Sequence, residues 1–501
     1  MNHSIKKTLL TGASSYIQMI AFLLMGLLSI RLATTYLTRE ELGIWNFVFA
    51  TVSYFAFLEL GLGPGIARLL ADPLAKGDQE KANSMFTTGV AFLGIQAVLF
   101  ISIGLLLRKP LLLWGGVPLS LWAPAEDLWT GVVLVRALTL PFVLLNAILW
   151  AQNRAYWIFV VSTVCPWIGL FFFAWALHHG GGLRAYIWNL SIPAVLNSFA
   201  LICAVVAGPH AFRLRVRSIR WSSASEIWGY SWAVFVASGA AQLSSLSQTV
   251  IVTRICGLDA TAAFGVTSRL PGMLMGVVTK PFDSFVPRWS AAFCQTGVVG
   301  VKREFIAMAR FSLLAVTATG IGVCLVNPGF VKVWTKPEFY GGSLLNVLLA
   351  FMLIYQMISR TFSYAFTMRK HMTGFAIASL FSVIIELTLQ AFFASRFGPA
   401  GVVIGYLIAV FGFLFWYILR NGSLMLEARA SEVFLPDLVW WLPSFSVAVL
   451  LCFAKLPPLS HSSWASLFLA TGVGLTLCLP IAWRCWQILQ PLLKDRHVFA
   501  G

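Results

Sequence analysis

Long apolar stretches alternate with short polar connections along the whole chain of 501 residues. A helix that crosses a bilayer needs roughly 20 mostly apolar residues, and about fourteen stretches approach this length. They are residues 9–33, 43–70, 85–107, 128–150, 157–177, 185–207, 227–250, 261–286, 309–333, 342–366, 373–394, 400–419, 438–456 and 464–485. Because the connections are short, they leave no room for a soluble catalytic domain. The pattern therefore predicts an all-α polytopic membrane protein that is not an enzyme.

The composition supports this interpretation and adds an orientation. Hydrophobic residues make up 59% of the chain and charged residues only 11%, which excludes a soluble globule with a polar surface. The net charge is +17, and the even-numbered connections collect most Lys and Arg if Lys6 and Lys7 are cytoplasmic. We therefore expect a multi-pass protein of the bacterial cytoplasmic (inner) membrane, with both termini in the cytoplasm. A nucleic-acid partner is not expected, because the chain has no basic soluble module.

The sequence offers few groups for metal or cofactor chemistry. The eight cysteines form no C-x-x-C pair and have no histidine at metal spacing, so they are expected to be buried small hydrophobic residues. The chain has no Walker A, H-E-x-x-H or G-x-S-x-G sequence. We expect no cofactor, no metal and no nucleotide-driven pumping by this chain alone.

A repeat divides the chain into two similar halves. Similar spacings of glycine and basic residues recur around the second and eighth apolar stretches, although chance spacing is the alternative. The matching positions are Gly43, Arg68, Gly77 and Lys81 in the first half and Gly265, Arg288, Gly297 and Lys302 in the second. The repeat predicts a six-helix lobe at 1–207, a basic cytoplasmic linker at 208–226, a second six-helix lobe at 227–420, and helices 13 and 14 with a cytoplasmic tail at 421–501. Since six is even, a pseudo-two-fold axis along the membrane normal should relate the two lobes.

Charged residues inside the apolar stretches are the sharpest indications of function, because a charge within the bilayer normally faces a wet cavity or a partner. Arg269 and Lys280 are eleven residues apart and should lie near one face of the eighth helix. Lys280 and Asp283 are three apart, so an ion pair between them is favoured, leaving Arg269 the freer cation. Prolines at 271, 281 and 287 are expected to interrupt the same helix and expose backbone groups to a cavity.

Other charges leave alternatives open. Glu59 could carry a proton or pair with a structural partner. Arg136 and Arg360 could line the cavity or play structural roles, and Arg31 could be a cation at the cavity rim or a snorkelling side chain. Glu386 is expected to be structural.

Residues 30–81 resemble the bacterial polysaccharide flippases of the Wzx type, within the multidrug/oligosaccharidyl-lipid/polysaccharide exporter (MOP) superfamily. The shared features are Arg31 at the end of the first helix, the Leu42-Gly43-Ile44-Trp45 run, and the run Leu58 to Gly63 followed by Arg68. The two-lobe plan with two extra helices extends the resemblance over the whole chain.

This resemblance implies a flippase that moves an undecaprenyl-diphosphate-linked oligosaccharide to the outer leaflet for O-antigen, capsule or exopolysaccharide synthesis. Alternating access would use a cationic cavity between the lobes, and a polysaccharide polymerase and chain-length proteins are possible partners. The expected substrate-binding residues are Arg269, Arg360, Arg136, Lys280 and Arg31, and the expected ion-coupling residues are Glu59 and Asp283. Alternatives are a lipid II flippase or a multidrug cation antiporter of the same superfamily. A membrane-embedded glycosyltransferase or polymerase is disfavoured, because the outer loops are too short for its catalytic residues.

Overall fold

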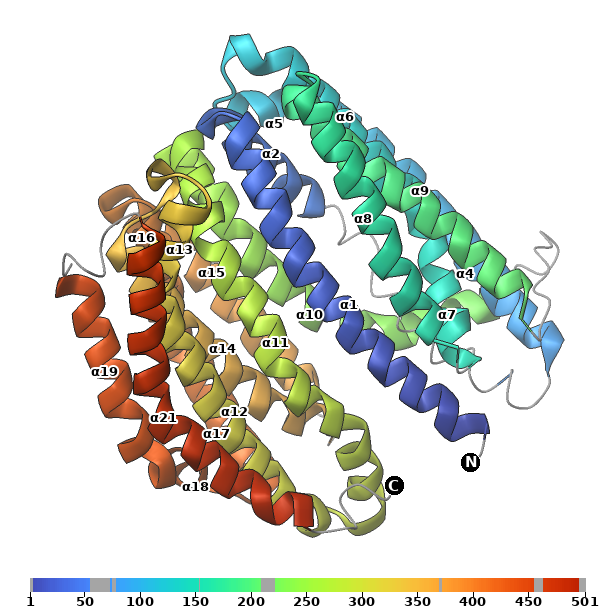
Figure 1. Cartoon of the computed structure of the whole chain (residues 1–501). Coiled ribbons are helices and arrows are strands. Elements are labelled where there is room, and N and C mark those ends of the chain that lie inside the picture. Colours follow the sequence, from blue (N-terminus) through green and yellow to red (C-terminus); the bar gives the residue numbers. More distant parts are fainter. Residues whose placement is uncertain are drawn as a thin grey trace. The chain divides into compact units, whose positions relative to one another are not determined.

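The computed structural model describes residues 3–54, 73, 78–152, 154–208, 221–368, 372–454 and 463–494 (Figure 1). All regular secondary structure in these ranges is helical, which confirms the predicted fold class. Eleven helices in the described residues are long and apolar enough to cross a membrane. Three further helices lie where the second, seventh and eighth spans are predicted: α2 (Arg39–Tyr54), α10 (Trp221–Cys256) and α11 (Leu258–Thr296). The chain is thus a multi-pass membrane protein.

The chain divides into two compact units, Met1–Asp259 and Ala260–Gly501. Besides α2 and α10, the first unit contains α1 (His3–Tyr36), α4 (Gln79–Leu106), α5 (Arg108–Trp114), η2 (Leu119–Leu121), α6 (Trp122–Thr139), η3 (Leu140–Phe142), α7 (Val143–Ala151), α8 (Tyr156–His178), η4 (Gly182–Arg184) and α9 (Ala185–Val206). The predicted lobe and linker boundaries stay predictions, and the linker at 208–226 lies mostly outside the described residues.

The second unit contains almost all of α11 and the C-terminal helices. Its other elements are α12 (Val299–Leu325), α13 (Asn327–Trp334), η6 (Pro337–Phe339), α14 (Ser343–Met368), α15 (Met372–Phe397), α16 (Pro399–Ala409), η7 (Val410–Leu414), α17 (Phe415–Leu426), α18 (Ala430–Phe434), η8 (Leu435–Asp437), α19 (Leu438–Ala454) and α21 (Trp464–Lys494). The order of elements repeats between the halves: α4, α5 and η2 have counterparts in α12, α13 and η6.

Small residues and aromatic rings hold the helices of the first unit together. The indole of Trp129 on α6 is fully buried and donates a hydrogen bond to the carbonyl oxygen of Gly104 on α4, at 2.8 Å. Trp45 on α2 stacks on Tyr186 of α9 with ring centroids 3.9 Å apart. A side chain at Gly43 would overlap the backbone carbonyl of Leu258, so glycine permits the close approach of α2 to the first residue of α11. The glycine and tryptophan of the Leu42–Trp45 run therefore have packing roles.

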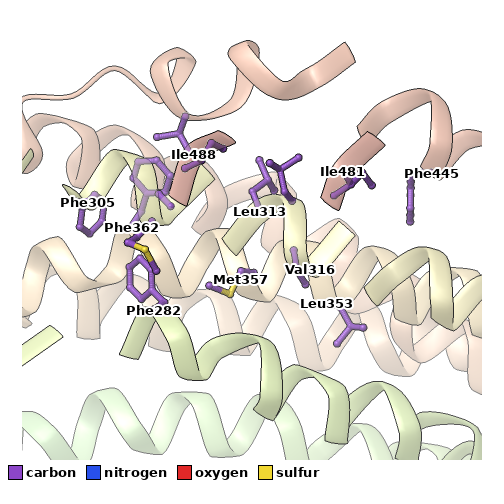
Figure 2. Packing of buried hydrophobic residues seen from close by; sticks show 14 of the residues in the cluster. Phe282, Phe305, Leu313, Val316, Leu353, Met357, Phe362, Phe445, Ile481 and Ile488 are labelled. Atoms are coloured by element: carbon purple, nitrogen blue, oxygen red, sulfur yellow. The ribbon is translucent and has the colours of Figure 1, made fainter. Parts of the chain in front are cut away.

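The core of the second unit gathers around α12. This helix packs against α14, α19 and α21, and α19 also packs against α21. Figure 2 shows side chains that these helices contribute along the core, among them Phe305, Leu353, Phe445 and Ile481. The C-terminal helices are therefore integral to this unit, because their apolar faces complete its core.

A buried carboxylate fixes the same helices through charge. Asp437 has no exposed surface and accepts hydrogen bonds from two guanidinium groups. Arg310 on α12 contacts it through two nitrogens, at 2.6 and 2.8 Å, and Arg484 on α21 through Nε at 2.7 Å. The sequence alone did not reveal this network, because Asp437 lies 127 positions from Arg310 and 47 from Arg484. Their shared carboxylate joins α12, η8 and α21 in one network.

We predict that Asp437→Asn strongly destabilises the second unit, because it leaves two partly buried guanidinium groups without their carboxylate. Removing one partner of such a buried pair typically costs about 3–5 kcal/mol. Thermal unfolding of the purified protein should show a clearly lower midpoint. The matched control is Asp127→Asn, whose pair with Arg184 is about half exposed and should contribute less than about 1 kcal/mol. Equal midpoints for the two variants would contradict the role of the buried network.

Candidate functional site

Helix α11 carries three of the predicted site residues. Its helical backbone runs without interruption from Leu258 to Thr296, so the expectation that three prolines interrupt it is wrong. Each proline lacks one backbone N–H donor, but the surrounding turns stay helical when neighbouring protein supports them. Arg269, Lys280 and Asp283 are consequently held on one rigid element, with about 16 Å of helix between the first two.

Asp283 forms an ion pair with Arg360 of α14. Its Oδ1 accepts hydrogen bonds from Nε and Nη2 of Arg360 at 3.1 and 2.9 Å, and its Oδ2 accepts one from Nη2 at 2.8 Å. The hydroxyl of Tyr364 donates to Asp283 Oδ1 at 3.2 Å, and the Arg360 guanidinium lies 5.9 Å from the centroid of the Tyr364 ring. Arg360, Asp283 and Tyr364 therefore form one polar cluster, here called the α11–α14 cluster.

The partner of Asp283 is thus Arg360 and not Lys280, which the sequence favoured. Within the described residues, no ion pair joins Asp283 to Lys280. The guanidinium of Arg360 reaches the carboxylate from a neighbouring helix and offers two donors in a planar fork, which suits a carboxylate better than a single ammonium. Sequence spacing along α11 could not reveal a partner 77 positions away.

The α11–α14 cluster packs against a buried apolar residue, yet its charged side chains remain partly exposed. Phe282, next to Asp283, is fully buried in the core (Figure 2). Its ring centroid lies 5.3 Å from that of Tyr364. The side chains of Arg360 and Asp283 are nonetheless 43% and 28% exposed. Both residues belong to predicted spans, where lipid contact would be costly for a charge. An aqueous cavity is the environment that suits them.

In the second unit, positive charge exceeds negative charge along the stretch of α11 around Asp283, here called the α11 wall. Arg269 is exposed and Lys280 is partly buried, both on α11. Asp283 already neutralises Arg360, so the cations at 269 and 280 remain as a surplus on this helix. An anionic ligand would be attracted to such a wall.

The other predicted residues lie in the first unit or outside the described part of the chain. Arg136 on α6 is exposed, and its guanidinium lies 5.2 Å from the ring centroid of Phe49 on α2. Arg31 is exposed near the end of α1. Glu59 lies outside the described residues. Their roles remain predictions.

A second buried carboxyl group lies in α15. Glu386 is only 2% exposed and accepts a hydrogen bond from the side-chain amide of Gln390 at 2.7 Å. Residues four positions apart lie on one face of a helix, so the sequence spacing could have indicated this pair. In the described part of the chain, no group of His, Cys, Asp and Glu side chains could hold a metal ion.

Comparisons with known proteins place the fold among membrane transporters. The model of the MatE family matches residues 15–175. Among curated proteins, none matches this sequence.

Three solved structures show the similarity at the level of the fold. The lipid II flippase MurJ in an inward closed conformation has a TM-score of 0.71 and 14% identity, covering 96% of this chain and 99% of its own. An inward-facing multidrug resistance MATE family transporter of the MOP superfamily has a TM-score of 0.69 and 14% identity, covering 81% of this chain and 96% of its own. A MOP superfamily transporter from Pyrococcus furiosus, described as having a binding pocket of reverse polarity, has a TM-score of 0.62 and 13% identity, covering 85% and 96% respectively.

A double-mutant cycle should verify the partner of Asp283. We expect Asp283→Asn and Arg360→Gln to be coupled by about 0.5–1 kcal/mol in unfolding free energy, a value reduced by their partial exposure. The parallel cycle with Asp283→Asn and Lys280→Gln should give coupling below about 0.3 kcal/mol. The reverse order would show that Lys280 is the effective partner.

Proposed function

We propose that this protein is a flippase that moves a polyprenyl-diphosphate-linked oligosaccharide across the cytoplasmic membrane. The observation that carries the proposal is the surplus of cations along α11 and α14, at positions where a charge needs water or an anionic partner. A diphosphate is a compact anion that guanidinium groups bind through paired hydrogen bonds. The polyprenyl tail could stay in the lipid while the headgroup crosses through water.

The fold comparison supports a flippase over a twelve-helix antiporter. The MurJ fold covers 96% of this chain, compared with 81% for the MATE family transporter. The C-terminal helices α19 and α21 supply part of the core of the second unit, so they belong to the functional body of the protein. A multidrug cation antiporter would moreover need an acidic site, whereas this wall is cationic. A lipid II flippase remains the second candidate, because its cargo carries the same diphosphate chemistry.

Within the proposal, Arg269, Lys280 and Arg360 bind the diphosphate, and Arg136 and Arg31 contribute further positive charge along the path. Asp283 holds Arg360 in the absence of cargo. Neutralising Asp283 would release the guanidinium for the diphosphate, which gives a physical route for coupling to a proton. Glu59 is the second candidate carrier.

Transport of a fluorescent polyprenyl-diphosphate oligosaccharide in proteoliposomes tests the anion site. Arg269→Ala and Arg360→Ala should each slow transport by about ten- to a hundredfold, because each removes a charge-assisted hydrogen bond worth roughly 1.5–3 kcal/mol. Lys280→Arg keeps the charge and should remain active. Arg184→Ala removes an exposed arginine in a peripheral pair and is the matched control. Normal transport by both alanine variants would locate the site elsewhere, and cationic-drug efflux without lipid transport would favour the antiporter.

The response to an imposed proton gradient tests coupling. Wild-type transport should accelerate when the gradient favours neutralisation of Asp283, since its hold on Arg360 then weakens. Asp283→Asn should transport at a rate that no longer responds to the gradient, whereas Asp127→Asn should respond like wild type. A full response in Asp283→Asn would exclude this carboxylate as the carrier, and Glu59→Gln would then be measured in the same way.

A further inference from the structure

A pocket of about 320 Å³ opens within the first unit, apart from the α11–α14 cluster. It lies where the start of α2, the end of α5 and the turn after α10 meet. The sequence predicts that this end of the unit faces the outside of the cell. Its volume is at the lower end of the range for small-molecule sites, which suits a ligand of one or two rings. Its chemically distinctive lining residues are Glu40, Trp114, Thr253, Arg254, Cys256 and Asp259.

Close backbone packing gives this pocket a firm base. A side chain at Gly115 would overlap the ring of Phe47, which is fully buried, and a side chain at Gly43 would overlap the carbonyl of Leu258. Gly116 and Gly257 have φ angles of 71° and 88°, which favour glycine and turn the chain at the pocket wall. The pocket is thus formed by tightly packed elements.

One wall combines an exposed aromatic side chain with an exposed cation. Trp114 is 41% exposed, and the guanidinium of Arg254 lies 5.6 Å from its ring centroid. Arg254 lies in the last turn of α10. Here it supplies hydrogen-bond donors beside a flat apolar surface.

The opposite charges are carboxylates at the rim. Glu40 and Asp259 are both exposed, and Asp259 has Arg39 at 4.0 Å. Arg39 is not itself a lining residue, but it pairs with Asp259, so Arg254 and Glu40 are the remaining charges of the lining. A diphosphate would meet two carboxylates, and an organic cation would be repelled by the positive charge of Arg254. A neutral ligand rich in hydroxyl groups fits better, because it can donate to the carboxylates, accept from Arg254 and stack on Trp114.

We propose that this pocket binds a neutral sugar unit of the transported oligosaccharide at the outer end of the first unit. This inference rests on the proposed flippase function and adds a saccharide site distinct from the anion site. Hydroxyl groups would bind Arg254, Glu40 and Asp259, while an apolar face of the sugar ring would lie on Trp114.

Binding can be measured without transport. The probes are neutral hexose disaccharides, observed by saturation-transfer NMR with the full-length protein in lipid nanodiscs. Trp114→Leu should weaken disaccharide binding about tenfold, which corresponds to roughly 1.4 kcal/mol and the upper range for aromatic contacts. Trp114→Phe should restore most of the binding. Trp334→Leu is the matched control, since Trp334 ends α13 as Trp114 ends α5.

The outcomes separate this inference from the proposed function. Disaccharide binding that depends on Trp114, but not on Trp334, supports the pocket even if lipid transport fails. Disaccharide binding that is absent or unchanged in Trp114→Leu overturns the inference, while lipid transport by the wild type would still support the flippase. Binding of tetraphenylphosphonium or pyrophosphate that depends on Trp114, in place of disaccharide binding, also overturns it.

Discussion

The cost of placing charge inside a bilayer is the constraint on which the functional interpretation depends. A charged side chain within a spanning helix must have water or a partner, and this chain shows both solutions. Asp437 is fully enclosed between Arg310 and Arg484, and serves packing. Asp283 and Arg360 are paired but remain open on one side. Exposure, more than the presence of an ion pair, separates the structural network from the candidate site.

The same constraint explains why two carboxylates with arginine partners differ in role. A fully buried pair is costly to break, because each separated charge stays without water. A half-exposed pair loses much less, since water can replace the partner. The Asp283–Arg360 pair can therefore open in exchange for another anion, whereas the network at Asp437 holds three elements of the second unit in place. In the proposed flippase, each unit would have to remain rigid internally while its binding groups change partners.

Sequence patterning was sufficient for the all-helical architecture because every span must satisfy its own backbone and present apolar side chains. In the structure, both halves also contain a short helix that ends in a tryptophan, α5 at Trp114 and α13 at Trp334. Partners across helices were not predictable. Asp283 was assigned to Lys280 because a single sequence reveals only neighbours along one helix, and Asp437 went unnoticed because its two arginines come from α12 and α21. The expectation that prolines interrupt α11 was wrong for a related reason. Whether a helix that contains proline stays continuous depends on the protein around it.

Diphosphate and sugar impose opposite demands, and the two proposed sites meet them separately. A diphosphate needs surplus positive charge, which α11 and α14 supply beyond the single carboxylate of Asp283. A sugar needs donors and acceptors in balance around an aromatic face, which Arg254, Trp114 and the carboxylates of the pocket provide. A single cavity that had to bind both the diphosphate and the sugar would bind neither well. Added cations would attract any anion, and added carboxylates would repel the diphosphate. In the proposed flippase, dividing recognition would let the constant headgroup be held strongly while weaker contacts, of about tenfold each, distinguish the sugars.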